Sequence, residues 1–411
     1  MPAPLAPPAP DTGSPGAGSP DATTGRLLAA VCDLAPTLAA RAEEVEARRR
    51  LPLDLLDELR SAGCFRMSLP RSHGGEELDL VTSMQVLEEL ARADGSVAWV
   101  VAIGASGWLD LVGLPRDTFD ALYADGPLVT AGVFAPSGIA QPVDGGYRIG
   151  GRWAFASGCE HADLLYGNCI DAGAEVGADG QGAAGGEGPP PMRIAVFAPD
   201  EVTIEDTWHV SGLCGTGSHH IVVDDLVVPA ERTFAVLTAE PCVDAVMARI
   251  PLPAPYALLL AGIALGIARG ALDDLLGLAA GKVPLLAAAE LARSPHLHLA
   301  LGEADARLRA AQATVHDEAR ALWRAAEAGD PIEVDQRARL RASSTWATTT
   351  AAAVVDTAYT AGGGTSLYAS SPLQRRLRDI HAVTQHFLVR PDTMTAAGAV
   401  LAGQEPTVPF L

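Results

Sequence analysis

The chain has 411 residues, 48% of them hydrophobic, which is enough to bury one large core or two to three packed subdomains. Its formal net charge of -21 at pH 7 argues against a nucleic-acid partner, because an acidic surface repels phosphates. The six cysteines form no CxxC pair, and the N-terminus lacks the charged-then-apolar pattern of a signal peptide. We therefore expect a reduced, cytoplasmic protein without structural zinc.

The first part of the chain is predicted to be a tail followed by helices. Residues 1–24 are mostly Pro, Ala, Gly and Ser, with too few large apolar side chains to order themselves, so we expect a disordered tail. From Arg26 onward, and again from Leu80 to Ile103, apolar residues recur at helical spacing. These patterns predict a helical domain over residues 25–127.

The rest of the chain divides into a β-rich and a helical part. Short runs of β-branched and aromatic residues predict a β-barrel or sandwich over residues 128–236, in which the Gly-, Ala- and acid-rich segment 172–191 is expected to be a mobile surface loop. Helical periodicity returns over residues 237–411, and four long alanine-rich helices predict an antiparallel bundle. Prolines and glycines interrupt the apolar run 250–268, so we expect a buried core helix there and no membrane span.

Two glycine-rich loops in the β-rich part carry the strongest functional signal. Segments 152–158 and 212–218 both lie beside strand-like runs, which places them at the ends of a sheet. Glycines allow backbone N–H groups to approach a planar ligand, and the hydroxyls of Ser157, Thr216 and Ser218 are able to bond its heteroatoms. The pair is typical of loops that contact a flavin, although ordinary tight turns have the same composition.

Stretches along nearly the whole chain beyond residue 25 resemble the acyl-CoA dehydrogenase fold. They are residues 59–75, 87–96, 153–158, 212–218, 224–229, 361–364 and 371–386. The resemblance implies an α+β fold with an N-terminal helical domain, a middle β-barrel or sandwich and a C-terminal four-helix bundle.

Two branches of that family use flavin in opposite ways. Acyl-CoA dehydrogenases hold FAD and need a carboxylate base beside the substrate, but segments 247–272 and 386–390, where the family places it, contain neither Asp nor Glu. The sequence Arg378-Asp379-Ile380-His381, followed by His386, instead resembles the signature of two-component monooxygenases such as 4-hydroxyphenylacetate hydroxylases. An acyl-CoA dehydrogenase-like FAD flavoprotein and a catalytically silent helical scaffold are the alternatives.

The monooxygenase resemblance implies a specific set of cofactors and partners. Such an enzyme takes reduced flavin, FMNH2 or FADH2, from a separate NAD(P)H-dependent flavin reductase and adds O2 at flavin C4a to form a hydroperoxide. It then transfers one oxygen atom to a small substrate, here an aromatic, polycyclic or amine compound. The resemblance further implies a homotetramer with sites completed across subunits and no metal.

The resemblance assigns His386 and Ser157 as catalytic residues. An imidazole with a pKa near 6.5 serves proton transfer around neutral pH, whereas the structural alternative for His386 is a helix-capping or core position. Ser157 is expected near flavin N5, with an ordinary turn serine as the alternative.

The remaining predicted site residues contact flavin or substrate. The expected flavin contacts are Trp99, Val133, Phe134, Ala135, Ala156, Ser157, Gly158, Thr216, Ser218 and Phe387, with Gly363 and Gly364 from a neighbouring subunit. Lys282 stands where the family has an arginine that meets the flavin phosphate. Small residues around Ser106 leave space for a larger or non-phenolic substrate, and Trp108 is expected either to line that pocket or to belong to the core.

Overall fold

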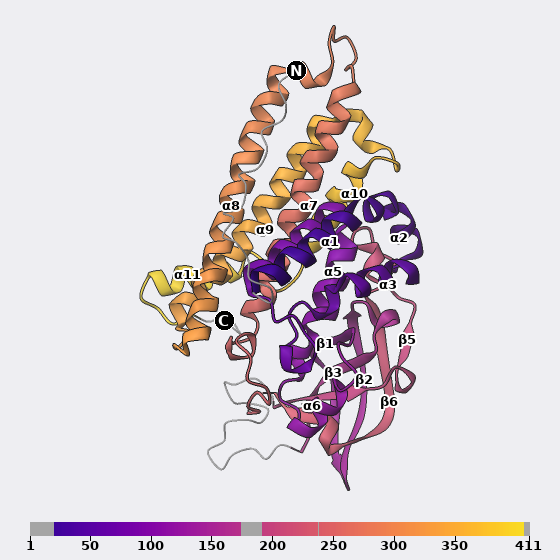
Figure 1. Ribbon diagram of the computed structural model, residues 1–411, viewed down its shortest axis with the longest axis vertical. Coiled ribbons are helices and arrows are strands. Elements are labelled where there is room, and N and C mark those ends of the chain that lie inside the picture. Colours follow the sequence, from indigo (N-terminus) through magenta and orange to yellow (C-terminus); the bar gives the residue numbers. More distant parts are fainter. Residues whose placement is uncertain (1–19, 174–190, 237, 407–411) are drawn as a thin grey trace.

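The computed structural model describes residues 20–173, 191–236 and 238–406, which form two helical regions with a sheet between them in sequence (Figure 1). The first region holds α1 (Pro20–Ala40), α2 (Ala42–Arg48), α3 (Leu53–Ala62), α4 (Leu80–Ala93), α5 (Gly95–Ser106) and α6 (Arg116–Leu122). Helix α1 begins inside the tail for which disorder was predicted. Residues 1–19 and most of the predicted mobile loop, 174–190, lie outside the described residues.

Two aspartates determine where α4 and α5 begin. The carboxylate of Asp79 accepts a hydrogen bond from Thr82 N at 3.0 Å and begins α4. Asp94 ends α4 and begins α5, because its carboxylate accepts from Val97 N at 3.0 Å. Such N-caps satisfy backbone donors that a helix start leaves free. Helix α5 therefore starts directly where α4 ends, and it contacts the sheet.

The middle of the chain forms one seven-stranded sheet in the order β5-β6-β2-β1-β3-β4-β7. Only the β1–β3 pair is parallel among the described strands. One face of the seven-stranded sheet covers a separate hydrophobic core around the buried indole of Trp153. The strands are β1 (Thr130–Val143), β2 (Gly146–Ala156), β3 (Leu164–Asp171), β4 (Met192–Phe197), β5 (Thr203–Glu205), β6 (His219–Pro229) and β7 (Thr233–Ala235).

The second helical region is a bundle packed against α4 and α5 (Figure 1). Helix α7 is long and apolar enough to cross a membrane, but 89% of its most apolar window is buried inside the protein. The run 250–268 thus belongs largely to the predicted core helix, and the predicted α+β fold with a terminal bundle is confirmed. The helices are α7 (Ala254–Gly281), α8 (Pro295–Ala328), α9 (Val334–Gly362), α10 (Pro372–Val383) and α11 (Thr393–Leu401).

Candidate active site

Two irregularities in neighbouring strands mark one end of the sheet. The β1–β3 register shifts between Val133 and Gly138, and the β2–β6 register shifts between Trp153 and Ala156. Since Gly138 pairs with Gly151, the antiparallel register of β1 and β2 brings the two irregularities side by side. Bulges turn side chains away from the regular alternation of a strand and are common beside active sites. They lie where the predicted flavin contacts Phe134, Ala135 and Ala156 are found.

A row of buried hydroxyls connects the two predicted flavin loops. Trp99 Nε1 donates to Ser157 Oγ at 3.0 Å, and Ser157 Oγ lies 2.7 Å from Ser218 Oγ. The row continues from Ser218 Oγ to Thr216 Oγ1 at 2.7 Å, and Thr216 donates to Leu213 O at 2.8 Å. Gly158 N also donates to Thr216 O. The structure thus brings together the predicted Trp99, Ser157, Gly158, Thr216 and Ser218, and the last two hydroxyls hold Ser157 in place.

His386 completes this group from the C-terminal side. Its ring meets the Trp99 ring edge-on, with centroids 5.6 Å apart, and Phe387 packs beside it. Leu388 N donates to Nδ1 of His386 at 3.3 Å, which assigns the imidazole proton to Nε2. Desolvation, and after it the positive charge of Arg341, lower the pKa of His386 to about 4. The expected pKa near 6.5 is therefore corrected: at neutral pH the half-buried ring is uncharged and presents an N–H donor.

The other histidine of the same signature occupies a different environment. His381 lies on α10 with half of its side chain exposed, and its Nε2 is 2.9 Å from Asp356 Oδ1. Exposed pairs of this kind contribute little to stability. In the described part of the chain, no hydrogen bond or ring contact joins His381 to Trp99, Ser157 or His386.

Phe155 is a candidate site residue that sequence reasoning missed. It is 68% exposed and has a positive φ of 68°, which is strained for a residue with a bulky side chain. Its carbonyl accepts from Ser157 N at 2.9 Å, so the strain lies two residues before Ser157. Because strand patterning allows any aromatic residue at this position, the sequence holds no signal for the strain. The geometry alone reveals it.

The residues around Ser157 fit a flat ligand with an apolar face and a polar edge. The Phe155 ring is largely exposed, meets the Trp208 ring edge-on with centroids 6.1 Å apart, and provides apolar surface two residues before Ser157. Gly158, with a φ of 73°, keeps the backbone after Ser157 free of a side chain. An exposed aromatic ring on a strained backbone gains free energy when a planar ligand covers it. The isoalloxazine ring of a flavin has this shape and polarity.

Lys282, Gly363 and Gly364 form a second group, at the C-terminal ends of α7 and α9. Lys282 Nζ donates to Gly362 O at 2.5 Å and to Thr365 Oγ1 at 2.8 Å. This ties the loop after α7 to the short helix η10 (Gly363–Leu367), where Gly363 has a φ of 58°. Among the contacts of the described residues, none joins this Lys282 corner to Trp99, Ser157 or His386.

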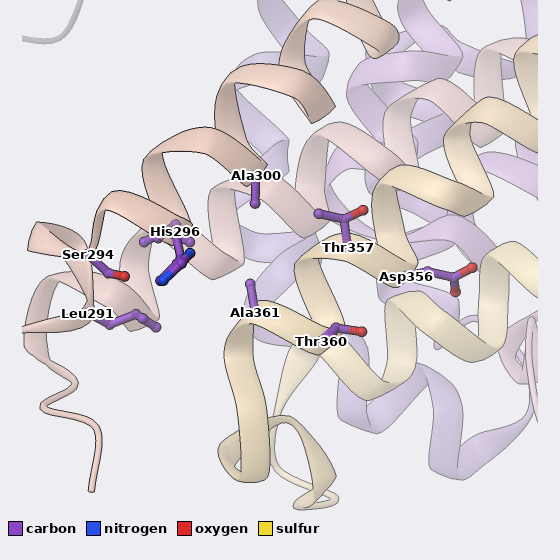
Figure 2. A pocket seen from close by; sticks show the side chains of 9 residues that line it. Leu291, Ser294, His296, Ala300, Asp356, Thr357, Thr360 and Ala361 are labelled. Atoms are coloured by element: carbon purple, nitrogen blue, oxygen red, sulfur yellow. The ribbon is translucent and has the colours of Figure 1, made fainter. Parts of the chain in front are cut away.

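A hollow of about 500 Å³ lies between the first turns of α8 and the last turns of α9 (Figure 2). Leu291 and His296, near the start of α8, face Thr357 and Ala361 of α9 across it. Leu291 N donates to Lys282 O at 2.7 Å, so the hollow and the Lys282 corner share a loop. None of the predicted flavin contacts lines the hollow, which separates it from the group around Ser157.

The two predicted substrate-pocket residues are buried. The Ser106 hydroxyl bonds Ala102 O of its own helix, and Trp108 Nε1 donates to Ser68 Oγ at 3.1 Å. Both side chains therefore occupy core positions with satisfied hydrogen bonds. Their assignment to the pocket stays a prediction.

The described residues contain no group of three or more His, Cys, Asp or Glu side chains arranged to hold a metal ion.

The fold and the site define a class, and comparisons with known proteins agree with it. Residues 26–112 match the family model for the acyl-CoA dehydrogenase N-terminal domain, and residues 258–391 match that for the acyl-CoA dehydrogenase C-terminal domain. The protein thus has the acyl-CoA dehydrogenase fold, within which the relatives identify one branch.

Those relatives are oxygenases. An indole-3-acetate monooxygenase of Pseudomonas putida is 35% identical over 375 residues, covering 90% of this chain and 92% of the relative. The oxygenase component of an FADH2-dependent resorcinol hydroxylase from Rhizobium sp. is 32% identical, covering 93% and 95%. The structure of XiaF from Streptomyces sp. in complex with FADH2 and glycerol superimposes with a TM-score of 0.86 at 26% identity, covering 95% and 98%.

The chain belongs to the flavin-dependent monooxygenases built on the acyl-CoA dehydrogenase fold. It is an oxygenase component that uses O2 and reduced flavin from a separate reductase to oxygenate a small molecule. The relatives favour this function over the alternative acyl-CoA dehydrogenase, in agreement with the missing carboxylate.

Proposed function

We propose that this oxygenase is a cytoplasmic homotetramer that uses FADH2 to hydroxylate an aromatic, polycyclic or amine substrate next to Trp99, Ser157 and His386. FADH2 is favoured over FMNH2 because the related resorcinol hydroxylase is FADH2-dependent and XiaF binds FADH2 in its complex. An aromatic substrate is favoured by the relatives that oxidise indole-3-acetate or resorcinol.

The observation that carries the proposal is the uncharged His386 against Trp99. Nε2 of His386 has no hydrogen-bond partner among the described residues, while Nδ1 is held by Leu388 N. A neutral N–H donor in a desolvated site stabilises a developing negative charge on oxygen without adding a charge of its own. Ser157, fixed by Trp99 and Ser218, holds its position relative to the flavin. A bound flavin supplies the oxygen activation.

The tetramer is supported by the surface around the Lys282 corner. Large apolar side chains project from the loop after α7 and from the end of η10, and they are exposed in the single chain. They are Val283, Leu285, Leu286, Leu367 and Tyr368. Exposed apolar side chains gathered in two loops that Lys282 ties together favour a contact site here. In a tetramer it brings Lys282, Gly363 and Gly364 of one subunit to the flavin of the next.

The test is the pair His386→Ala and His381→Ala, assayed with a free flavin reductase, NADH and indole. Loss of the His386 donor is expected to lower product per NADH about 100-fold and to raise hydrogen peroxide correspondingly, the size typical of a proton-transfer or oxyanion group. His381→Ala, which removes an exposed pair, should retain normal coupling. Unchanged coupling in His386→Ala would remove this residue from the reaction.

A further inference from the structure

A cluster of polar side chains lies buried between η3 (Gly107–Leu111), β3 and α7. Tyr166 donates its hydroxyl proton to Asp110 Oδ2 at 2.5 Å, and Tyr256 Oη is 2.6 Å from the same oxygen. The nearby hydroxyl of Tyr123 is buried without a hydrogen-bond partner among the described residues. No Lys or Arg pairs with Asp110 in the described part of the chain. A buried carboxylate without a cation is costly, so this cluster calls for an explanation beyond packing.

Two half-buried residues lie close to the cluster. Along residues 95–111, which span α5 and η3, Ile103 alone is not fully buried. Along residues 254–268 of α7, the same is true of Tyr256 alone. The Tyr256 hydroxyl lies 3.0 Å from Ser106 O, one helical turn beyond Ile103. Ile103 and Tyr256 are therefore the most exposed positions of these two helical stretches, and the hydrogen bond to Ser106 O places the Tyr256 hydroxyl one turn from Ile103.

One face of α5 connects Trp99 with the Tyr256 hydroxyl. Trp99, Ile103 and Ser106 are spaced i, i+4 and i+7, which places them on one face of the helix. Seven residues of α-helix span about 10 Å, so the Tyr256 hydroxyl lies about that far from Trp99 along the axis. This matches a two-ring aromatic molecule in van der Waals contact at both ends. The substrate expected at Trp99 would therefore reach Tyr256.

The chemistry of the cluster limits what it binds. Tyr166 and Tyr256 each have one hydroxyl proton, and both are directed to acceptors within the protein. An ionised Asp110 has no proton to donate. The tyrosine oxygens and the carboxylate thus offer only lone pairs to a ligand. A substrate with a ring N–H or phenolic O–H satisfies them, whereas a carboxylate would be repelled.

We propose that Tyr256, oriented by Asp110 and Tyr166, forms the far wall of the substrate pocket and selects aromatic substrates that carry a hydrogen-bond donor. The inference rests on the proposed function for the position of the substrate beside Trp99. Asp110 lies eleven residues beyond Trp99 and acts through Tyr256, so it is a positioning residue and does not replace the missing carboxylate base at the flavin.

The test measures binding of indole and benzofuran, which share a shape but differ in the ring N–H, by calorimetric titration without flavin. At pH 8 Asp110 is ionised, because desolvation raises its pKa only to about 6. The wild-type chain should bind indole about tenfold more tightly than benzofuran, the size of one hydrogen bond to a charge-supported acceptor. Tyr256→Phe and Asp110→Asn should weaken indole binding and leave benzofuran binding unchanged. Tyr123→Phe is the matched control and should keep the preference.

The ratio of the two affinities separates recognition from folding. A purely structural role for the cluster would weaken both ligands equally or only lower thermal stability, and this would overturn the proposal. Equal binding of both probes by the wild type, or no binding of either, would do so as well. Because no flavin or O2 is present, these results are independent of whether His386 proves essential in the coupling assay.

Discussion

The two groups of predicted flavin contacts differ in how complete they are within one chain. The Trp99–Ser157–Ser218 row is buried and hydrogen-bonded, and it receives His386 from the far end of the sequence. The Lys282 corner is half exposed, is built from loops and is flanked by apolar side chains such as Leu286, which is 98% exposed. The first group is preorganised by folding, whereas the second is suited to being completed by assembly.

The largest effect should come from separating the two groups onto different subunits. Lys282→Glu reverses the charge at the Lys282 corner, and His386→Ala removes the imidazole N–H donor beside Trp99. Each variant alone should therefore be nearly inactive. If one subunit supplies the corner to the next, mixed assemblies regain sites that carry neither substitution. In a random mixture about a quarter of the sites should be intact, given a two-fold interface. Co-refolding the two variants and measuring hydroxylated product checks this.

Each variant refolded by itself is the control, and it should remain inactive. Recovery near a quarter of wild-type activity would place the two groups of one site on different chains. No recovery, with mixed assemblies confirmed by mass, would mean that Lys282 and His386 serve the same flavin within one chain. That result would contradict the proposed assembly and leave the roles of the two residues to be tested separately.

A smaller effect is expected at Phe155, where the strained backbone lowers stability while the exposed ring is expected to support flavin binding. Phe155→Gly removes the strain of the positive φ, which should raise the stability of the flavin-free protein by about 1 kcal/mol. The same change removes apolar surface that a flavin would cover, so flavin affinity should fall about tenfold. Thermal unfolding and anaerobic titration with FADH2 measure the two quantities.

A rise in stability together with a fall in FADH2 affinity would show that the backbone strain at Phe155 serves flavin binding. The matched control is Phe234→Ala, at a half-buried aromatic on β7 outside the site, which should lower stability without a specific loss of flavin affinity. If Phe155→Gly instead destabilises the protein and leaves affinity unchanged, the exposed ring packs for structural reasons. The proposed contact with the flavin face would then be wrong.

The proximity of Ser157, Ser218 and His386 to Trp99 follows from residue type and position along the chain, while their contact with flavin stays a prediction. Ser157, Thr216 and Ser218 lie in loops recognisable from their glycines, and His386 from its spacing after Arg378-Asp379. The structure brings these residues together as the resemblance implies. Resemblance carries such information because the spacing of contacts to a common ligand changes little within a family.

What the sequence leaves out depends on tertiary environment. The strain at Phe155 results from the bulge in β2, and the lowered pKa of His386 results from desolvation that only packing defines. The same holds for Asp110 and Tyr256, which lie 146 residues apart in sequence and meet only in the folded chain. Periodicity cannot show that Tyr256 is half-buried on an otherwise buried helix.

The smallest effect should be a pH dependence of stability that comes from Asp379, which holds the loop at Leu213. The carboxylate of Asp379 on α10 is buried and accepts a hydrogen bond from Leu213 N at 2.7 Å, beside the hydroxyl row. Desolvation, and after it the negative charge of Asp94, raise the pKa of Asp379 to about 7. An unfolded aspartate has a pKa of about 3.9, so the folded state binds the proton more tightly. Its contribution is therefore complete below about pH 4 and is lost as pH rises through 7.

Between pH 6 and 8 this titration should reduce the free energy of unfolding by about 1 kcal/mol. His386 acts in the opposite direction at the acid end of this range, because its lowered pKa means that stability is lost as pH falls from about 6.5 towards 4. Asp379→Asn keeps an oxygen for Leu213 N, removes the titration of residue 379 and leaves His386 in place. The difference in stability between wild type and Asp379→Asn, measured by chemical denaturation, should therefore change by about 1 kcal/mol from pH 6 to pH 8. If wild type and Asp379→Asn respond identically to pH, the buried aspartate does not titrate in this window. The loop that carries Leu213 would then be held by an ionised carboxylate throughout.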